Sequence, residues 1–254
     1  MRYLFYILLG LLPSFIWLSF YLRKDKKPEP NSMVLKIFVW GMVMAPLAII
    51  LELFLIWLLN PNINPFDILS QIPQASLIKI TLAATLIPAL VEEYLKYAVV
   101  KFRVLKHSAF NEPTDTMIYC IIAGLGFAAV ENLMVLIKIS GPGFSQALST
   151  ITFRFLGATL VHALASGIIG YWLAKGLLHL EQKRKLVSIG LGLAILFHTC
   201  YNYFILNAFE QAAGNQQIFF IFLAALLLIS ATLLISYYFR KLKKQRSICL
   251  SPKI

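Results

Sequence analysis

The chain has 254 residues, of which 59% are hydrophobic and only 13% are charged. Soluble globular proteins carry about 25% charged residues, so this composition excludes a soluble enzyme and an intrinsically disordered chain. The net charge of +12 does not indicate nucleic-acid binding, because the basic residues lie in short segments between long apolar stretches. Together these features predict an all-α, polytopic membrane protein.

The apolar stretches predict a bundle of about seven transmembrane helices, because each approaches the roughly 20 residues needed to cross a bilayer. They form one predicted integral-membrane domain over residues 1–254. The first stretch has no basic leader and no small-residue cleavage site, so it is predicted to be a retained span and not a signal peptide. The predicted spans cover residues 3–22, 34–59, 77–100, 116–138, 148–174, 186–207 and 217–239.

Basic residues gather in alternate connections between these spans, whereas the connections around 60–76, 139–147 and 208–216 contain almost none. Because cytoplasmic segments are enriched in Lys and Arg, the N-terminus is predicted to lie outside and the C-terminus in the cytoplasm. The basic residues that carry this prediction are Arg23, Lys24, Lys26, Lys27, Lys101, Arg103, Lys106, Lys175, Lys183, Arg184, Lys185, Arg240, Lys241, Lys243, Lys244 and Arg246.

Ionisable residues occur inside four consecutive predicted spans, which together form a motif-bearing core of about residues 77–207. A charged side chain in the bilayer costs at least about 2.5–3.5 kcal/mol and usually marks a functional site. In the third span, Glu92 and Lys96 are spaced i,i+4 and are predicted to pair. Glu93 points about 100° away from Glu92 and is predicted to contact a different neighbour.

The next three spans add further polar residues at helical spacing. Glu131 follows Phe127 by one turn and has Asn132 beside it, and two histidines each share a face with a polar residue. We expect Glu92, Glu93, Glu131, His162 and His198 to converge in one buried cavity as catalytic residues. The predicted supporting residues are Lys96, Asn132, Ser166 and Asn202.

Two chemistries fit this set. In the first, a buried glutamate activates water as a general base while histidines or Asn202 donate to the oxyanion. Glu92 is the preferred base because Lys96 shares its face, and Glu93 remains a close alternative. In the second, His162, His198 and Glu131 hold a metal that keeps a position open for water. The spacing does not decide between them.

Over roughly residues 80–205 these motifs resemble those of the PrsW family of bacterial intramembrane proteases. The family's EExxK motif is matched by residues 92–96 and its FxxxEN motif by residues 127–132. Its two histidine motifs are matched by His162 with Ser166 and by His198 with Asn202, and the segment 112–119 is also similar. The resemblance to the CAAX prenyl protease and bacteriocin-immunity group is more distant, because that group has EExxxR and a histidine in place of Glu131.

The resemblance implies an intramembrane endopeptidase, multi-pass in a bacterial cytoplasmic membrane, that cleaves single-span membrane proteins such as anti-sigma factors. It implies either Zn²⁺ or a glutamate-activated water without metal, the lipid bilayer as surroundings, and no nucleic-acid partner. Two other functions stay open from the residues alone. A proton-coupled transporter also uses Glu and His, although no internal repeat supports it. A non-catalytic scaffold could bind transmembrane helices through the same groove.

Other polar residues receive simpler interpretations. Glu52 in the second span is predicted to pair structurally with Arg154 or Lys79. Lys96 is expected to be an electrostatic partner and not a nucleophile. Ser166 is expected to pack between helices or to bond substrate, because only His162 on the same helix lies near enough to activate it.

Overall fold

The computed structural model describes residues 2–24, 27–59, 82–107, 110–138, 144–211 and 213–245. Within these ranges every regular element is helical and none is a strand, as the sequence predicts. The elements are α1 (Arg2–Leu22), α2 (Asn31–Leu59), the π-helical turn η3 (Leu82–Leu86), α5 (Ile87–Arg103), α6 (Pro113–Lys138), α7 (Phe144–Leu156), α8 (Ala158–Leu178), the 3-10 turn η4 (Leu180–Gln182), α9 (Lys183–Leu206), the π-helical turn η5 (Asn207–Gln211) and α10 (Asn215–Leu242).

Among the described residues, six helical segments are long and apolar enough to cross a membrane: α1, α2, α6, α7 with α8, Leu180–Phe209 and α10. The predicted third span is represented by η3 and the more polar helix α5. The predicted fifth span is one segment in extent but is interrupted at Gly157, where φ and ψ of −108° and −97° separate α7 from α8. The multi-pass helical bundle predicted from hydropathy is therefore confirmed.

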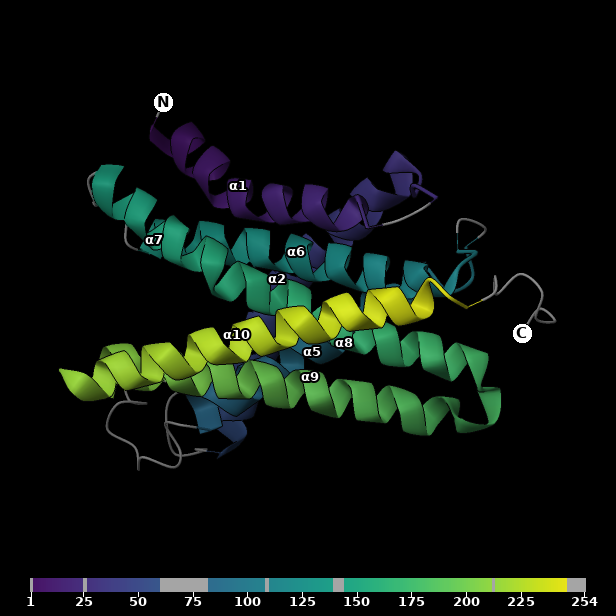
Figure 1. Ribbon diagram of the computed structural model, residues 1–254. Helices are drawn as coiled ribbons and strands as arrows, with labels where there is room; N and C mark the ends of the chain where they lie inside the picture. The colour runs from purple at the N-terminus through teal and green to yellow at the C-terminus, as the bar shows by residue number, and fades with distance from the viewer. Residues whose placement is uncertain are drawn as a thin grey trace.

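Helices α6 and α8 form the centre of the bundle. Residues 113–129 of α6 and 159–171 of α8 are buried without interruption. Small residues allow the neighbours of these helices to approach closely. A Cβ added at Gly41 would collide with the backbone carbonyl of Ala123, and one added at Gly126 would collide with that of Phe38. Helix α2 therefore lies in backbone contact with α6 and fixes one wall of the interior (Figure 1).

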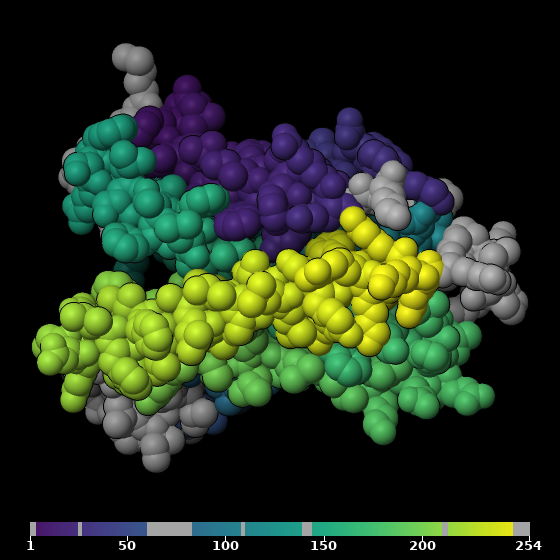
Figure 2. Space-filling model, viewed as in Figure 1, coloured from purple at the N-terminus to yellow at the C-terminus, as the bar shows by residue number. Residues whose placement is uncertain are grey.

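The outer helices present apolar side chains outward. Helix α10 crosses the face seen in Figure 2, and its Phe219, Phe222 and Leu233 are all exposed. Similar side chains are exposed on α1 and α2, including Leu8 and Ile50. Continuous apolar surface of this kind suits contact with lipid and not with water.

The segment before α6 positions helices. The Asp115 carboxylate accepts hydrogen bonds from the backbone N–H groups of Asn111 at 2.8 Å and Glu112 at 2.7 Å. Tyr119 donates a hydrogen bond to Glu29, and Lys27 lies 2.7 Å from Glu112. These contacts tie the α1–α2 connection to the beginning of α6. The similarity of residues 112–119 to the family motif therefore concerns the scaffold of the bundle.

The basic ends of several helices lie together. The α8–α9 connection and the C-terminal end of α10 lie at the same end of the bundle, away from the N-terminus (Figure 1). Lys183, Arg184 and Lys185 belong to the first of these segments, and Arg240 and Lys241 belong to the second. Their shared position agrees with the alternation of charge that the sequence displays.

Candidate active site

One turn of α5 directs three charged side chains into the bundle. Lys96 Nζ lies 3.1 Å from Glu92 Oε2 and 2.8 Å from Glu93 Oε1, so the predicted pair of Glu92 with Lys96 is present. Glu93 contacts a different neighbour, His198, as predicted, and it also shares Lys96 with Glu92. Positions i−3 and i−4 both adjoin a helical residue, and the flexible lysine stem reaches both carboxylates.

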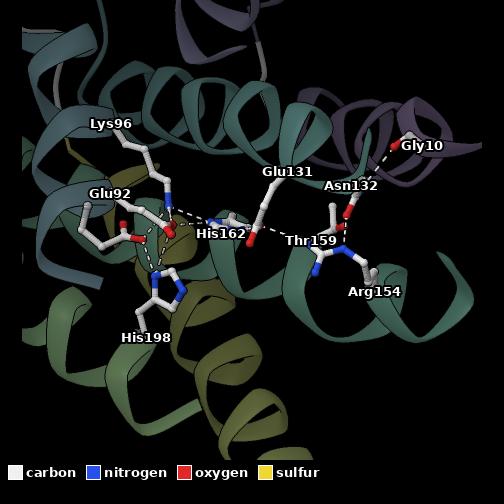
Figure 3. A network of polar contacts seen from close by, with 10 residues as sticks. Gly10, Glu92, Lys96, Glu131, Asn132, Arg154, Thr159, His162 and His198 are labelled. Carbon is white, nitrogen blue, oxygen red and sulfur yellow. Dashed lines mark hydrogen bonds and ion pairs between the residues drawn. The ribbon is translucent and has the colours of Figure 1, made fainter. Parts of the chain in front are cut away.

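Two imidazoles from other helices complete this cluster (Figure 3). His162 Nδ1, on α8, lies 2.6 Å from Lys96 Nζ, and His198 Nδ1, on α9, lies 2.8 Å from Glu93 Oε1. The same two nitrogens lie 3.6 Å and 4.0 Å from Glu92 Oε2. Glu92, Glu93, Lys96, His162 and His198 are all buried. The structure therefore brings acids and imidazoles together inside the bundle, as the sequence predicts.

The partners of each ring assign its proton. The ammonium of Lys96 can only donate, so Nδ1 of His162 accepts and Nε2 carries the hydrogen. That Nε2–H donates to Glu131 Oε2 at 2.7 Å. His198 is the reverse case, because its Nδ1 donates to the carboxylate of Glu93. Nδ1 is therefore the acceptor in His162 and the donor in His198.

Glu131, on α6, contacts His162 on the side opposite Lys96. It also belongs to a second set of polar contacts. Arg154 Nη2 lies 2.9 Å from Glu131 Oε2, and Arg154 Nε donates to Asn132 Oδ1 at 2.6 Å. Asn132 in turn donates to Thr159 Oγ1 at 3.1 Å and to the Gly10 carbonyl at 3.3 Å. Figure 3 shows these residues extending from the Lys96 cluster toward α1. Glu131 therefore orients His162 and is itself fixed from the other side.

The residues that could hold a metal differ from the predicted ligand set. One ligand atom each from Glu92, Glu93, His162 and His198 all lie within 4.8 Å of one another. Oε2 of Glu93 is buried and has no hydrogen-bond partner among the described residues. Carboxylate and imidazole donors suit zinc, so this set fits a divalent metal. Glu131, which the sequence suggested as the carboxylate ligand, contacts the opposite nitrogen of His162 and is replaced by the α5 carboxylates.

Aromatic and apolar groups close the cluster. The Phe127 ring lies 4.5 Å from Lys96 Nζ and 5.5 Å from the His162 ring, so Phe127 shares the Glu131 face as predicted. Val91 and Leu95 of α5 pack with Phe127 on the same side. These contacts limit the access of water to the charged groups, which strengthens electrostatic interactions between them.

Two of the predicted supporting residues make no hydrogen bond to the charged cluster. Ser166 Oγ is buried without a hydrogen-bond partner in the described part of the chain, and it packs against Gly124. Asn202 is half-buried, and the described residues offer its side chain no hydrogen bond. The suggested pairing of Glu52 with Arg154 is wrong because Arg154 binds Glu131 and Asn132, and Lys79 lies outside the described residues. Glu52 instead lies within electrostatic range of the charged cluster, including Glu92 and Lys96.

Arg154 is the functional residue that sequence reasoning placed with the wrong partner. It precedes the break at Gly157 and is the only charged residue of α7. A single arginine in an apolar segment is the feature of the sequence that could have indicated a buried partner. Thr159, which receives a hydrogen bond from Asn132, was not predicted because a threonine in an apolar span is common. Neither contact can be read from helical spacing, since both join different helices.

The fold and the cluster define a polytopic helical membrane protein with a buried glutamate–histidine site. The family model for the PrsW family intramembrane metalloproteases matches residues 29–230, and the chain belongs to this family. The predicted intramembrane protease is thereby confirmed over the transporter and the scaffold.

Curated relatives agree with this assignment. Protease PrsW of Geobacillus kaustophilus is 30% identical over 198 residues, which cover 78% of this chain and 78% of the relative. Protease PrsW of Oceanobacillus iheyensis is 29% identical over 204 residues, covering 79% of this chain and 82% of the relative. Protease PrsW of Bacillus subtilis is 29% identical over 201 residues, covering 78% and 81%. No solved structure matches the chain.

Proposed function

We propose that this protease hydrolyses a peptide bond in a single-span membrane protein, such as a membrane-anchored anti-sigma factor. The observation that carries the proposal is the position of Glu92 Oε2, 3.6 Å from His162 Nδ1 and 4.0 Å from His198 Nδ1. This juxtaposition lies among helices long enough to cross a membrane. A carboxylate beside two imidazoles can activate water and transfer its proton.

Glu92 is the proposed general base. Its side chain is 9% exposed, whereas that of Glu93 is 0% exposed. A general base must reach the water that it deprotonates, so the more accessible carboxylate is better suited. Glu93, which contacts both Lys96 and His198, is the proposed anchor that fixes those two side chains.

The histidines have separate proposed roles. His162, held by Glu131 on one nitrogen, presents the other nitrogen to the cluster, an arrangement typical of metal-binding histidines. His198 donates through Nδ1 to Glu93, so its Nε2 can accept a proton and pass it to the leaving amine. When zinc is bound, Glu93, His162 and His198 would supply the three protein ligands of a catalytic site, and Glu92 would stay free. His198 would then be a ligand and would not carry the proton. Such a metal would polarise the scissile carbonyl.

We place the protein in a bacterial cytoplasmic membrane, with the basic end of the bundle in the cytoplasm. The support is the shared position of the α8–α9 connection and the end of α10 (Figure 1). Cytoplasmic segments carry an excess of Lys and Arg. A cysteine introduced at Lys185 should react with a membrane-impermeant thiol reagent only after the cells are opened. Labelling in intact cells would reverse the assignment.

The proteolytic proposal is tested with purified protein in liposomes and single-span substrates, whose products are identified by mass spectrometry. We expect cleavage within or next to the substrate's membrane segment. Glu92→Gln should lower kcat about 10²–10⁴-fold, the range for loss of a general base. Glu181→Gln, which alters an exposed glutamate of η4, is the matched control and should cleave normally. Cleavage that survives both Glu92→Gln and His198→Ala would exclude the proposed site.

A further inference from the structure

Lys96 lies at the centre of the donor set that could hold a metal. Its Nζ is within 2.8 Å of Glu93, 3.1 Å of Glu92 and 2.6 Å of His162 Nδ1. The side chain is only 1% exposed. An ammonium group has three hydrogens to donate, and three of the four candidate ligand residues receive them. The site therefore already contains a cation that belongs to the chain.

The contact with His162 makes this cation a competitor of a metal ion. The Nδ1 of a neutral imidazole has one lone pair, which here accepts from Lys96. A metal needs the same lone pair, because zinc binds the unprotonated imidazole nitrogen. His162 cannot turn its other nitrogen inward without giving up Glu131, which Nε2 contacts at 2.7 Å. Nδ1 of His162 can therefore accept a hydrogen bond from Lys96 or bind a metal, but it cannot do both at once.

Charge balance leads to the same conclusion. Glu131 is neutralised by Arg154, at 2.9 Å, on the far side of His162. Glu92 and Glu93 have Lys96 as their partner, and without a counter-charge two buried carboxylates would repel one another strongly. Lys96 therefore stabilises the metal-free site in the way that a bound cation would.

We propose that Lys96 is a built-in counter-cation that occupies the metal position in the metal-free protein and must move aside for a divalent metal to bind. The Phe127 ring, 4.5 Å from Nζ, offers the displaced ammonium a favourable surface. The four-carbon lysine stem permits such a shift without movement of α5. This inference rests on the proposed function, because it concerns the same four residues.

The test compares zinc binding by the metal-free protein and its variants in detergent, using a chromophoric chelator as competitor. Lys96→Met, which keeps the length and removes the charge, should bind Zn²⁺ at least tenfold more tightly than the unaltered protein. Lys96→Arg keeps the charge and should show no such gain. Lys36→Met, at an exposed position near the start of α2, is the matched control and should bind as the unaltered protein does.

Thermal unfolding gives a second readout that does not depend on activity. Metal-free Lys96→Met should unfold at a lower temperature than the unaltered protein, and zinc should raise its Tm by more. If Lys96→Met fails to fold, Lys96→Gln serves in both measurements. Zinc binding by the neutral variant that is equal to or weaker than that of the unaltered protein, or no zinc binding by either, overturns the inference. Cleavage by the unaltered protein is measured separately and reports on the proposed function alone.

Discussion

Arg154 Nη2 lies 2.9 Å from the Glu131 carboxylate, and that carboxylate lies 2.7 Å from His162 Nε2. Arg154 lies on α7, before the interruption at Gly157, and His162 lies on α8, after it, so Glu131 of α6 links the two helices by contacting both side chains. A second bond, from Arg154 Nε to Asn132 Oδ1 at 2.6 Å, fixes the plane of the guanidinium. The orientation of His162 thus depends on a residue that does not contact the charged cluster of α5.

Arg154→Gln should therefore lower kcat for a membrane-embedded substrate by roughly 10–100-fold, the usual effect of losing an outer partner of a site histidine. KM should change little, because Arg154 acts through Glu131. The measurement is steady-state cleavage in liposomes, with the variant's helix content checked by circular dichroism.

The controls for this prediction are Arg154→Lys and Arg240→Gln. Lysine keeps the charge but loses the two-pronged contact with Glu131 and Asn132, so it should restore part of the rate. Arg240 is exposed at the end of α10, and Arg240→Gln should cleave normally. A rise in KM with unchanged kcat would contradict the assigned positioning role.

The two adjacent glutamates should differ in their contribution to stability. Glu93 is fully buried and contacts both Lys96 and His198, whereas Glu92 is 9% exposed. Removing one partner of a buried ion pair costs about 3–5 kcal/mol. Glu93→Gln should therefore lower the free energy of unfolding in mixed micelles by about that amount, and Glu92→Gln by less. Equal losses of stability would show that the two carboxylates share the structural role. A larger loss for Glu92→Gln would assign that role to Glu92.

The close contact of α2 with α6 predicts a localised packing defect. A methyl group at Gly126 would strike the Phe38 carbonyl, and neither backbone can move without displacing its helix. Gly126→Ala should lower the free energy of unfolding by about 1–3 kcal/mol, the typical effect of overpacking. Gly192→Ala is the control, because nothing lies within 4 Å of a Cβ built there. It should be neutral or slightly stabilising, since alanine favours a helix.

Ser166→Ala separates packing from nucleophilic catalysis. Its hydroxyl is buried without a hydrogen-bond partner in the described residues. Removing an unsatisfied buried polar group is close to neutral for stability, so we expect near-normal folding and cleavage. Loss of a true nucleophile can lower kcat by about 10⁶-fold. A loss of that order, or covalent labelling of Ser166 by a serine-directed inhibitor, would refute the water-based mechanism.

Much of this architecture follows from the order of residues. Long apolar stretches predict the spans, and acids and imidazoles inside them predict a buried site, because both are costly in lipid. The interruption at Gly157 could not be predicted, since glycine is well tolerated within membrane helices. At this position a Cβ would meet the Tyr201 hydroxyl, a contact between α9 and the interruption that the sequence alone does not show.

Contacts between helices were harder to predict than contacts within one. The Glu92–Lys96 pair follows from helical spacing, but the partner of Arg154 depends on how α6 and α7 align. Helical periodicity gives the direction in which a side chain points from its own helix. It does not say how a neighbouring helix is positioned along the bundle axis. For the same reason helical spacing suggests Glu131 as the carboxylate ligand, although Glu131 contacts the outer nitrogen of His162 and the α5 carboxylates gather with a nitrogen of each imidazole within 4.8 Å.

The charged cluster is formed by residues of three separate helices, α5, α8 and α9. Its members lie far apart in the sequence, since His198 and Glu93, which share a hydrogen bond, are separated by 105 positions. Because α9 follows α5 in the chain, α5 is synthesised first. The cluster can therefore form only after α9 has been made and has packed against α5 and α8.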